Sequence, residues 1–206
     1  MAALICIDVG NTSAHWGRVD GRSVVESGDI STATLCEGGH TLSELLAKRG
    51  LGGVALASVV PNATRALLPA LEASRLPVHH LRHDTVRGLG FDYPAPAEVG
   101  QDRLANCVGA QLLVGPPAIV IDMGTATTFD VLTSRGYAGG IIAPGLGVMT
   151  SYLHTRTALL PELDPAGLLG GPVVGKSTVD AMRAGCRIGF AGMVAALLES
   201  VAGEVR

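Results

Sequence analysis

Short apolar runs separated by turn residues recur along this chain, and one ordered set of them occurs twice. An apolar run over residues 3–9 ends in Asp8-Val9-Gly10-Asn11-Thr12, and another over residues 117–123 ends in Asp122-Met123-Gly124-Thr125-Ala126-Thr127. Two further strand-like stretches with a turn between them follow each run, over residues 14–19 and 23–26 and over residues 127–133 and 137–143. This repeat predicts an internal duplication, in which each of two similar lobes begins with three connected strands.

Segments with apolar positions at helical spacing fill the gaps between these strands. Asn62 is expected to cap one of the helices, and Pro69 is expected to bend or split it. Helices are predicted over residues 41–49, 63–73, 102–114, 146–159 and 177–199, with short strands near residues 54–60 and 78–81. Gly115-Pro116-Pro117 marks the predicted boundary between an N-terminal lobe, 1–115, and a C-terminal lobe, 116–206.

The composition suits an α/β protein and argues against two classes of partner. Of the 206 residues, 48% are hydrophobic and 16% are charged, with a formal net charge of −3 and no run of basic residues. Neither nucleic acid nor a membrane is an expected partner, because a basic patch is missing and the longest strongly apolar run, 188–198, is too short to cross a bilayer. The four cysteines are far apart and the chain starts without a signal-peptide pattern, so a cytoplasmic protein with reduced thiols is expected.

The two acid-Gly turns are the first candidates for chemistry. Asp8 ends a buried strand, where its carboxylate would hold a hydrated Mg²⁺ ion. Gly10 lets the backbone N–H groups around it face a ligand, and such concavities bind phosphate. One turn of this kind also occurs in plain hairpins. A second at a matching place, Asp122-x-Gly124-Thr125, favours two turns that face each other across a cleft and hold different phosphates of one nucleotide.

A proline-containing loop leads into the third candidate, Gly100-Gln101-Asp102-Arg103. An Asp at a helix start is often only a cap. With Arg103 and Gly100 beside it, Asp102 also suits a site in which one group accepts a proton and the next binds a carboxylate. The residues alone leave both interpretations open, and the same holds for the segment from Gly139-Gly140 to Pro144-Gly145, which is either a turn before a helix or a functional loop.

Two further patterns are not expected to carry function. The segment 170–177 matches the P-loop pattern G-x-x-x-x-G-K-S, but no convincing strand precedes it and no strand ending in an acidic residue follows it. His79, His80 and His83 cluster without the Cys or acidic residues that complete a zinc site, so we expect them to be solvated.

Taken together, the candidate segments resemble the type III pantothenate kinases, a family of the acetate and sugar kinase, Hsp70 and actin superfamily. The matching pieces occur in family order between residues 8 and 185, and the ordered set is more specific than any single piece. They are Asp8-Val9-Gly10-Asn11-Thr12, Tyr93 with Pro96-x-Glu98-Val99-Gly100-x-Asp102-Arg103-x-x-Asn106, Asp122-x-Gly124-Thr125-Ala126-Thr127, Gly139-Gly140-x-Ile142-x-Pro144-Gly145, Thr157-Ala158-x-Leu160-Pro161 and Gly175-Lys176-x-Thr178-x-x-Ala181-x-x-x-Gly185.

The resemblance implies a duplicated ribonuclease-H-like (actin-like ATPase) α/β fold, with two lobes and a central cleft. It implies a cytoplasmic transferase, an enzyme that uses ATP to phosphorylate the terminal hydroxyl of pantothenate in the first step of coenzyme A biosynthesis. It also implies Mg²⁺, a monovalent cation (K⁺ or NH₄⁺), and a homodimer with the active site at its interface.

The resemblance also assigns roles to individual residues. Asp102 would be the catalytic proton acceptor, and Asp122 would bind the monovalent cation. Pantothenate would be held by Tyr93, Gly100, Gln101, Asp102, Arg103 and, across the dimer, Thr178. ATP would be held by Asp8, Val9, Gly10, Asn11, Thr12, Gly124 and Thr125, with Asp8 also near Mg²⁺.

One departure from the family pattern leaves alternatives open. Family members run on past the last helix to a strand and a Thr-Gly-Gly turn near the adenosine, whereas this sequence stops at Arg206. The second lobe is therefore expected to lack its closing portion. The alternatives are a non-catalytic pantothenate-binding or regulatory homologue that lost its ATP-binding end, and another sugar or acid kinase of the same fold. The Gly100-x-Asp102-Arg103 loop, which suits a small carboxylate substrate, argues against the latter.

Overall fold

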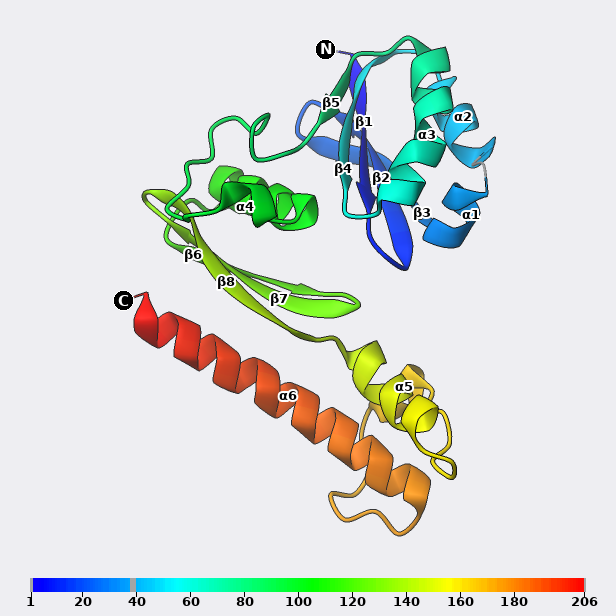
Figure 1. Ribbon diagram of the computed structural model, residues 1–206, viewed down its shortest axis with the longest axis vertical. Helices are drawn as coiled ribbons and strands as arrows, with labels where there is room; N and C mark the ends of the chain where they lie inside the picture. The colour runs from blue at the N-terminus through cyan, green and yellow to red at the C-terminus, as the bar shows by residue number, and fades with distance from the viewer. Residues whose placement is uncertain (1, 38–39, 206) are drawn as a thin grey trace. The chain divides into compact units, whose positions relative to one another are not determined.

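The computed structural model describes residues 2–37 and 40–205 of the chain (Figure 1). The chain forms two compact units, Met1–Gly109 and Ala110–Arg206, which we call the first and the second unit. A five-stranded sheet belongs to the first unit and a three-stranded sheet to the second. This confirms the predicted α/β class with two sheets.

The first unit is built on a sheet with the strand order β3-β2-β1-β4-β5. The central strand β1 pairs antiparallel with β2 and parallel with β4. The strands are β1 (Ala3–Val9), β2 (Ser13–Asp20), β3 (Ser23–Ser31), β4 (Leu51–Ser58) and β5 (Val78–His80). The helices are α1 (Thr32–Cys36), α2 (His40–Leu46), α3 (Pro61–Ser74) and the 3-10 turn η1 (Pro96–Glu98), and α4 (Gln101–Leu113) begins in this unit.

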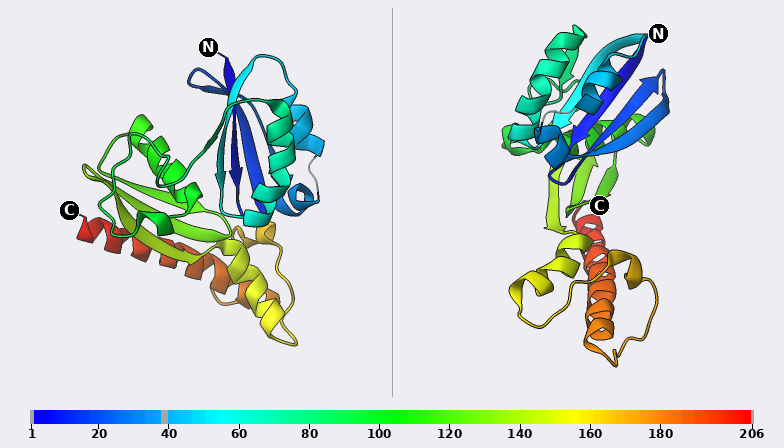
Figure 2. Two further views of the ribbon diagram at one scale, coloured as in Figure 1. Left: turned by 45° about the horizontal axis from the view of Figure 1, so that its top comes forward. Right: turned by 90° about the vertical axis from the view of Figure 1, so that its right-hand side faces the viewer.

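The alternation of side chains along β1 decides which face of the first sheet carries the core. Ile5, Ile7 and Val9 are buried in one apolar cluster together with side chains of α3. Figure 2 shows α3 lying along this face. Successive side chains of a strand point to opposite faces, so Cys6 and Asp8, both half-buried, lie on the other face. The candidate residue Asp8 therefore projects away from the core.

The second unit combines a small antiparallel sheet with two longer helices. Its strands, in the sheet order β6-β7-β8, are β6 (Ala118–Met123), β7 (Ala126–Thr133) and β8 (Gly136–Pro144). They are followed by α5 (Leu146–Arg156), the 3-10 turn η2 (Pro165–Leu168) and α6 (Thr178–Glu204). A small apolar cluster of Leu163, Leu168, Met182 and Cys186 packs η2 and its flanking loop against α6.

The strand registers confirm the predicted duplication. Val19 pairs with Val24 in the first unit, and Leu132 pairs with Tyr137 in the second. Each residue of the second pair lies 113 positions after its counterpart in the first pair. The register shift between β2 and β3 falls at Arg18/Val19, and the shift between β7 and β8 falls at the equivalent Val131/Leu132. A register shift at the same place in both hairpins is a three-dimensional feature that composition alone could not repeat.

The start of α3 differs from the expectation. The helix begins at Pro61 rather than after an Asn62 cap, and the Asn62 side chain instead accepts a hydrogen bond from Arg65 at 2.6 Å. Proline is favoured at the first helical position, where its missing N–H has no partner to lose. The helix also continues through Pro69 to Ser74, so the predicted split is wrong.

The last helix, α6, begins as predicted. The hydroxyl of Ser177 accepts a hydrogen bond from the Asp180 amide at 3.1 Å and caps the helix. The segment before α6 consists of η2 and a loop, in place of the strand that a P-loop requires. The 27-residue helix is long and apolar enough to cross a membrane by length and composition, with a mean hydropathy of 1.4 over an 18-residue window that is 17% buried. Core helices of proteins that never enter a bilayer have the same length and composition, so this one helix does not indicate a membrane span.

Candidate active site

The first turn connects β1 to β2 through Gly10, Asn11 and Thr12. The Gly10 amide donates to the Ser13 carbonyl at 3.0 Å, which closes the turn tightly. Asn11 and Thr12 are exposed at its tip. Peptide groups in a closed turn of this kind keep a fixed direction, which is what phosphate binding by backbone amides requires.

Asp8 and Val9 end β1 directly before this turn. Asp8 is half-buried and lies opposite His15 of β2 and Ala57 of β4. Val9 is fully buried, and its carbonyl accepts the Val59 amide at 3.0 Å. The side chain of Val9 thus belongs to the core, and a contact of this residue with a nucleotide would involve its backbone.

Thr32, at the start of α1, is hydrogen-bonded to the first turn and was missed by the sequence analysis. Its hydroxyl donates to the Gly10 carbonyl at 2.7 Å and its amide donates to the Thr12 carbonyl at 3.1 Å. Thr32 is only 5% exposed. No signal in the sequence marked Thr32, because Gly10 lies 22 positions away and the third strand was expected to end at Glu26.

The start of α4 carries the candidate base. The Gly100 carbonyl accepts the Leu104 amide at 3.1 Å, and Asp102 Oδ1 accepts the Arg103 amide at 2.8 Å. Asp102 therefore lies inside the first helical turn, with one carboxylate oxygen fixed by the backbone. A Cβ atom at Gly100 would collide with Asp102 Oδ1, so glycine is needed there to let the carboxylate take this position.

Gln101 attaches the start of α4 to the first sheet. Its side-chain oxygen accepts the Ser58 amide at 2.9 Å, and Ser58 is the last residue of β4, paired with Val9 of β1. Because β1 and β4 are parallel, both strands end at the same edge of the sheet, and the first turn lies at this edge too. The first turn and the Gly100–Arg103 segment, which are far apart in sequence, are thus brought to one edge of the sheet.

A cavity of about 610 Å³ opens on the face of the first sheet opposite the core. Several glycine and alanine residues are among those that line this space. The cavity is lined by Cys6, Asp8, His15, Ala57, Ala105 and Val108, among others. Asp8 is therefore one of the residues that line this cavity.

The second turn, in the second unit, is also closed by a hydrogen bond from its glycine amide. The Gly124 amide donates to the Ala126 carbonyl at 2.9 Å, and the Gly145 amide donates to the Thr125 carbonyl at 3.0 Å. Asp122, Gly124 and Thr125 are all exposed. The second turn has one residue fewer than the first. Residue 118 before this turn lies 114 positions after its counterpart, residue 4, whereas residue 132 after the turn lies 113 positions after residue 19.

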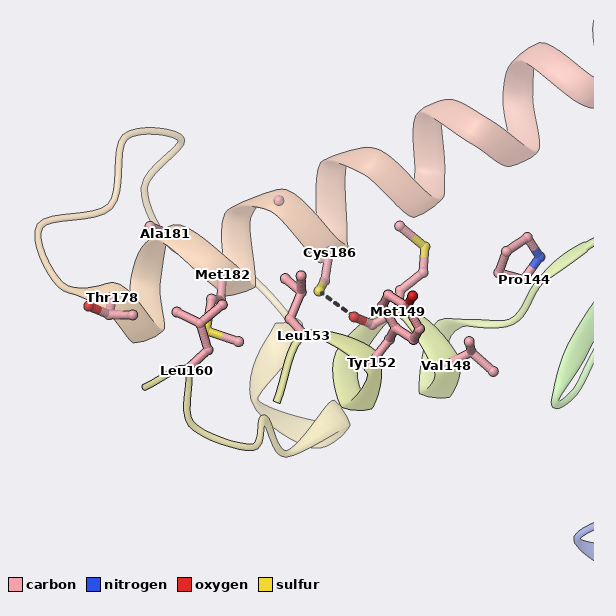
Figure 3. Close-up of a pocket in the computed structure, with 11 residues that line it drawn as sticks. Pro144, Val148, Met149, Tyr152, Leu153, Leu160, Thr178, Ala181, Met182 and Cys186 are labelled. Atoms are coloured by element: carbon pink, nitrogen blue, oxygen red, sulfur yellow. Dashed lines mark hydrogen bonds between the residues drawn. The ribbon is translucent and has the colours of Figure 1, made fainter. Parts of the chain in front are cut away.

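Thr178 lies elsewhere in the second unit, as the first residue of α6. A Cβ atom at Gly175 would collide with the Ala181 amide, so the loop before α6 passes tightly over the helix start. Thr178 lines one end of a pocket of about 770 Å³ between α5 and α6, and Pro144 lines the other end (Figure 3). The pocket wall between them is almost entirely apolar and includes Met149, Tyr152 and Leu153.

The predicted site residues therefore fall into three groups. The first unit brings together Asp8, Val9, Gly10, Asn11 and Thr12 with Gly100, Gln101, Asp102 and Arg103, and Tyr93 is half-buried in the loop before η1. The second turn carries Asp122, Gly124 and Thr125, and Thr178 is separate at α6. In the described part of the chain, no three His, Cys, Asp or Glu side chains converge as a metal cage.

Comparison with known proteins decides the family. The family model of type III pantothenate kinase matches residues 4–200. The chain belongs to the type III pantothenate kinase family. A type III pantothenate kinase of Akkermansia muciniphila is 43% identical over 168 residues, covering 81% of this chain and 67% of the relative. One of Streptomyces avermitilis is 38% identical over 232 aligned positions, covering 98% of this chain and 81% of the relative.

The fold agrees with this family membership. A crystal structure of a conserved Baf family protein from Campylobacter jejuni superposes with a TM-score of 0.58 at 17% identity, over 94% of this chain and 78% of that chain. At this level of identity the match concerns the fold alone. The duplicated α/β fold expected of a type III pantothenate kinase is therefore confirmed by both the family match and the repeated strand registers.

The four thiols give a first testable prediction about the accessibility of the cavity beside Asp8. All four cysteines are free, Cys36 is exposed, and burial raises the pKa of the Cys6 thiol. A raised pKa lowers the thiolate fraction at neutral pH, and the thiolate is the reactive form. Timed iodoacetamide labelling with peptide mapping should find Cys36 modified well before Cys6. Equal rates in the folded protein would contradict the described burial, and unfolding in denaturant should remove the difference.

Proposed function

We propose that this chain transfers the γ-phosphoryl group of ATP to the terminal hydroxyl of pantothenate, as its family membership implies. The observation that carries the proposal is the pair of equivalent acid-Gly turns, one in each unit, combined with the Gly100–Arg103 segment at the edge where the first turn lies. Phosphoryl transfer depends mainly on positioning and on neutralising charge, which fixed turns and charged side chains provide.

In this proposal the Gly100–Arg103 segment binds pantothenate. Asp102 accepts the proton of the attacking hydroxyl through the carboxylate oxygen that the Arg103 amide does not fix, and the proton remains on the carboxylate until product release. The Arg103 guanidinium pairs with the pantothenate carboxylate. Gly100 and Tyr93 complete the pocket wall, and Gln101 contributes by anchoring the segment to Ser58.

The two turns bind the phosphates of ATP in the same proposal. At the first turn we assign Val9, Gly10, Asn11 and Thr12 to the ATP phosphates, with the Asn11 and Thr12 amides as donors because the Gly10 amide already donates to the Ser13 carbonyl. At the second turn we assign Gly124 and Thr125. Oxygen donors at strand ends fit hard cations, which prefer few carboxylates plus water and phosphate oxygens. Asp8 would hold Mg²⁺, which neutralises phosphate charge when bound, and Asp122 would hold K⁺ or NH₄⁺.

A homodimer with Thr178 at the partner's pantothenate site completes the proposal. Exposed apolar side chains on α6 and α5, such as Ile188 (44% exposed) and Tyr152 (54%), give a second copy apolar surface to cover. Four free cysteines fit the reducing cytoplasm, where we place the reaction. Light scattering on the purified chain should report twice the mass of one chain, 21.0 kDa, and a monomer would contradict the dimer.

A substrate panel tests the proposed function. We expect ADP formation that requires Mg²⁺, rises with K⁺ and is faster with pantothenate than with other alcohols, including sugars and small hydroxy acids. A sugar preferred over pantothenate would indicate another kinase of the same fold. Pantothenate binding by calorimetry without any nucleotide binding or turnover would indicate the non-catalytic homologue instead.

A further inference from the structure

The residue directly after the third strand has the same backbone role in both units. In the first unit the Thr32 amide donates to the Thr12 carbonyl at 3.1 Å, and in the second the Gly145 amide donates to the Thr125 carbonyl at 3.0 Å. Thr32 and Gly145 are 113 residues apart, the same displacement as the strands before them. The contact between this position and the turn after the first strand is therefore part of the duplicated unit.

The two units differ in how this residue meets the carbonyl of the turn glycine. The Thr32 hydroxyl donates to the Gly10 carbonyl at 2.7 Å. In the second unit the Gly124 carbonyl lies where a side chain of Gly145 would begin, so no side chain fits. The first turn is thus held by a side-chain hydrogen bond, and the second turn by close backbone packing.

The hydrogen bond of Thr32 also fixes the direction of the next amide. A trans peptide is planar, so the N–H of Asn11 points opposite to the C=O of Gly10. Because that carbonyl points toward buried Thr32, the Asn11 N–H points toward the exposed tip of the turn. Without the hydroxyl, the Gly10–Asn11 peptide could flip, since glycine tolerates many backbone conformations. A flipped peptide would present a carbonyl oxygen to the phosphates and repel them.

We propose that Thr32 is a positioning residue for the nucleotide, whose hydroxyl keeps the first turn in the orientation that presents amides to phosphate. Thr32 itself touches no substrate and acts through Gly10 and Asn11. The inference rests on the proposed function in one respect, namely that the anion at this turn is a phosphate of ATP.

Three variants test this role. Thr32→Val removes the hydroxyl and keeps the shape, Thr32→Ser keeps the hydroxyl, and Thr133→Val is a matched control. The Thr133 hydroxyl also donates to a backbone carbonyl, that of Gly136 at 3.3 Å, but at the opposite end of β7 from the second turn. Each variant is measured for Mg·AMPPNP binding by calorimetry, for the KM values of ATP and pantothenate, and for Tm.

We expect Thr32→Val to weaken Mg·AMPPNP binding and to raise the KM of ATP, each about five- to tenfold, the effect of losing one hydrogen bond that orients the turn. The KM of pantothenate should not change, and Thr32→Ser and Thr133→Val should bind Mg·AMPPNP like the wild type. Thr32→Ala serves as the second variant if valine lowers Tm below the assay temperature.

Unchanged Mg·AMPPNP binding by Thr32→Val would overturn the inference, as would equal losses in Thr32→Val and Thr32→Ser. Parallel increases in both KM values would point to a structural role and overturn it too. A wild type that binds Mg·AMPPNP but does not phosphorylate pantothenate contradicts the proposed function alone, and the binding data then decide on Thr32. Absence of Mg·AMPPNP binding by the wild type would overturn both.

Discussion

Replacing Asp102 with Asn should lower kcat by about 10²- to 10⁴-fold, the usual contribution of a positioned proton acceptor. The amide oxygen of Asn can still accept the Arg103 amide, as Asp102 Oδ1 does at 2.8 Å, so the first turn of α4 should keep its structure. The other side-chain atom becomes an NH₂ group, which cannot accept a proton. We therefore expect a loss in kcat with little change in Tm or in the KM of either substrate.

Glu72→Gln, the same change from carboxylate to amide on the exposed surface of α3, is the matched control and should leave kcat unchanged. Steady-state kinetics of the two variants and the wild type check this prediction. If Asp102→Asn retained wild-type kcat, the proton would have another acceptor, and Asp102 would be only a helix-start residue.

Replacing Gly145 with Ala should both destabilise the second unit and lower activity. An added Cβ would collide with the Gly124 carbonyl and lie 2.5 Å from the Thr125 carbonyl, so the second turn would have to move. Overpacking costs about 1–3 kcal/mol of unfolding free energy, and a turn displaced by about 1 Å can cost about 10²-fold in activity. Chemical denaturation and kcat/KM for ATP measure the two effects.

Gly147→Ala provides the matched control two residues further on, in α5. No described atom outside its neighbours and its own helix backbone lies within 4 Å of a Cβ added there, and alanine favours helix over glycine. This variant should keep full activity and lose no stability. A Gly145→Ala variant as stable and active as Gly147→Ala would show that the second turn is not held by this close approach.

Much of this site could be predicted from the sequence because its parts are local. The turns after Asp8 and Asp122 each follow a buried strand directly, and their similarity was sufficient to predict the duplication that the registers confirm. The first three strands of each unit follow from alternation and turn residues in the same way. Local patterns of this kind depend on few long-range contacts.

The features that the sequence did not predict depend on contacts between distant residues or on competing local signals. Strand β3 was expected to end at Glu26 but continues to Ser31, because it is an edge strand whose polar residues remain exposed while pairing with β2. At α3 two start signals compete, and Pro61 prevails over Asn62. The hydrogen bonds from Thr32 to the first turn and from Ser58 to Gln101 join residues 22 and 43 positions apart, which no local pattern reveals.

Phosphoryl transfer to pantothenate is tested most directly by a ³¹P NMR time course of the purified chain with Mg·ATP, K⁺ and pantothenate. We predict that the γ-phosphate resonance of ATP is replaced by a phosphomonoester resonance of phosphopantothenate in equal amount, and that Asp102→Asn produces it far more slowly. Release of inorganic phosphate without the phosphomonoester, or an unchanged ATP spectrum, would show that the chain does not phosphorylate pantothenate.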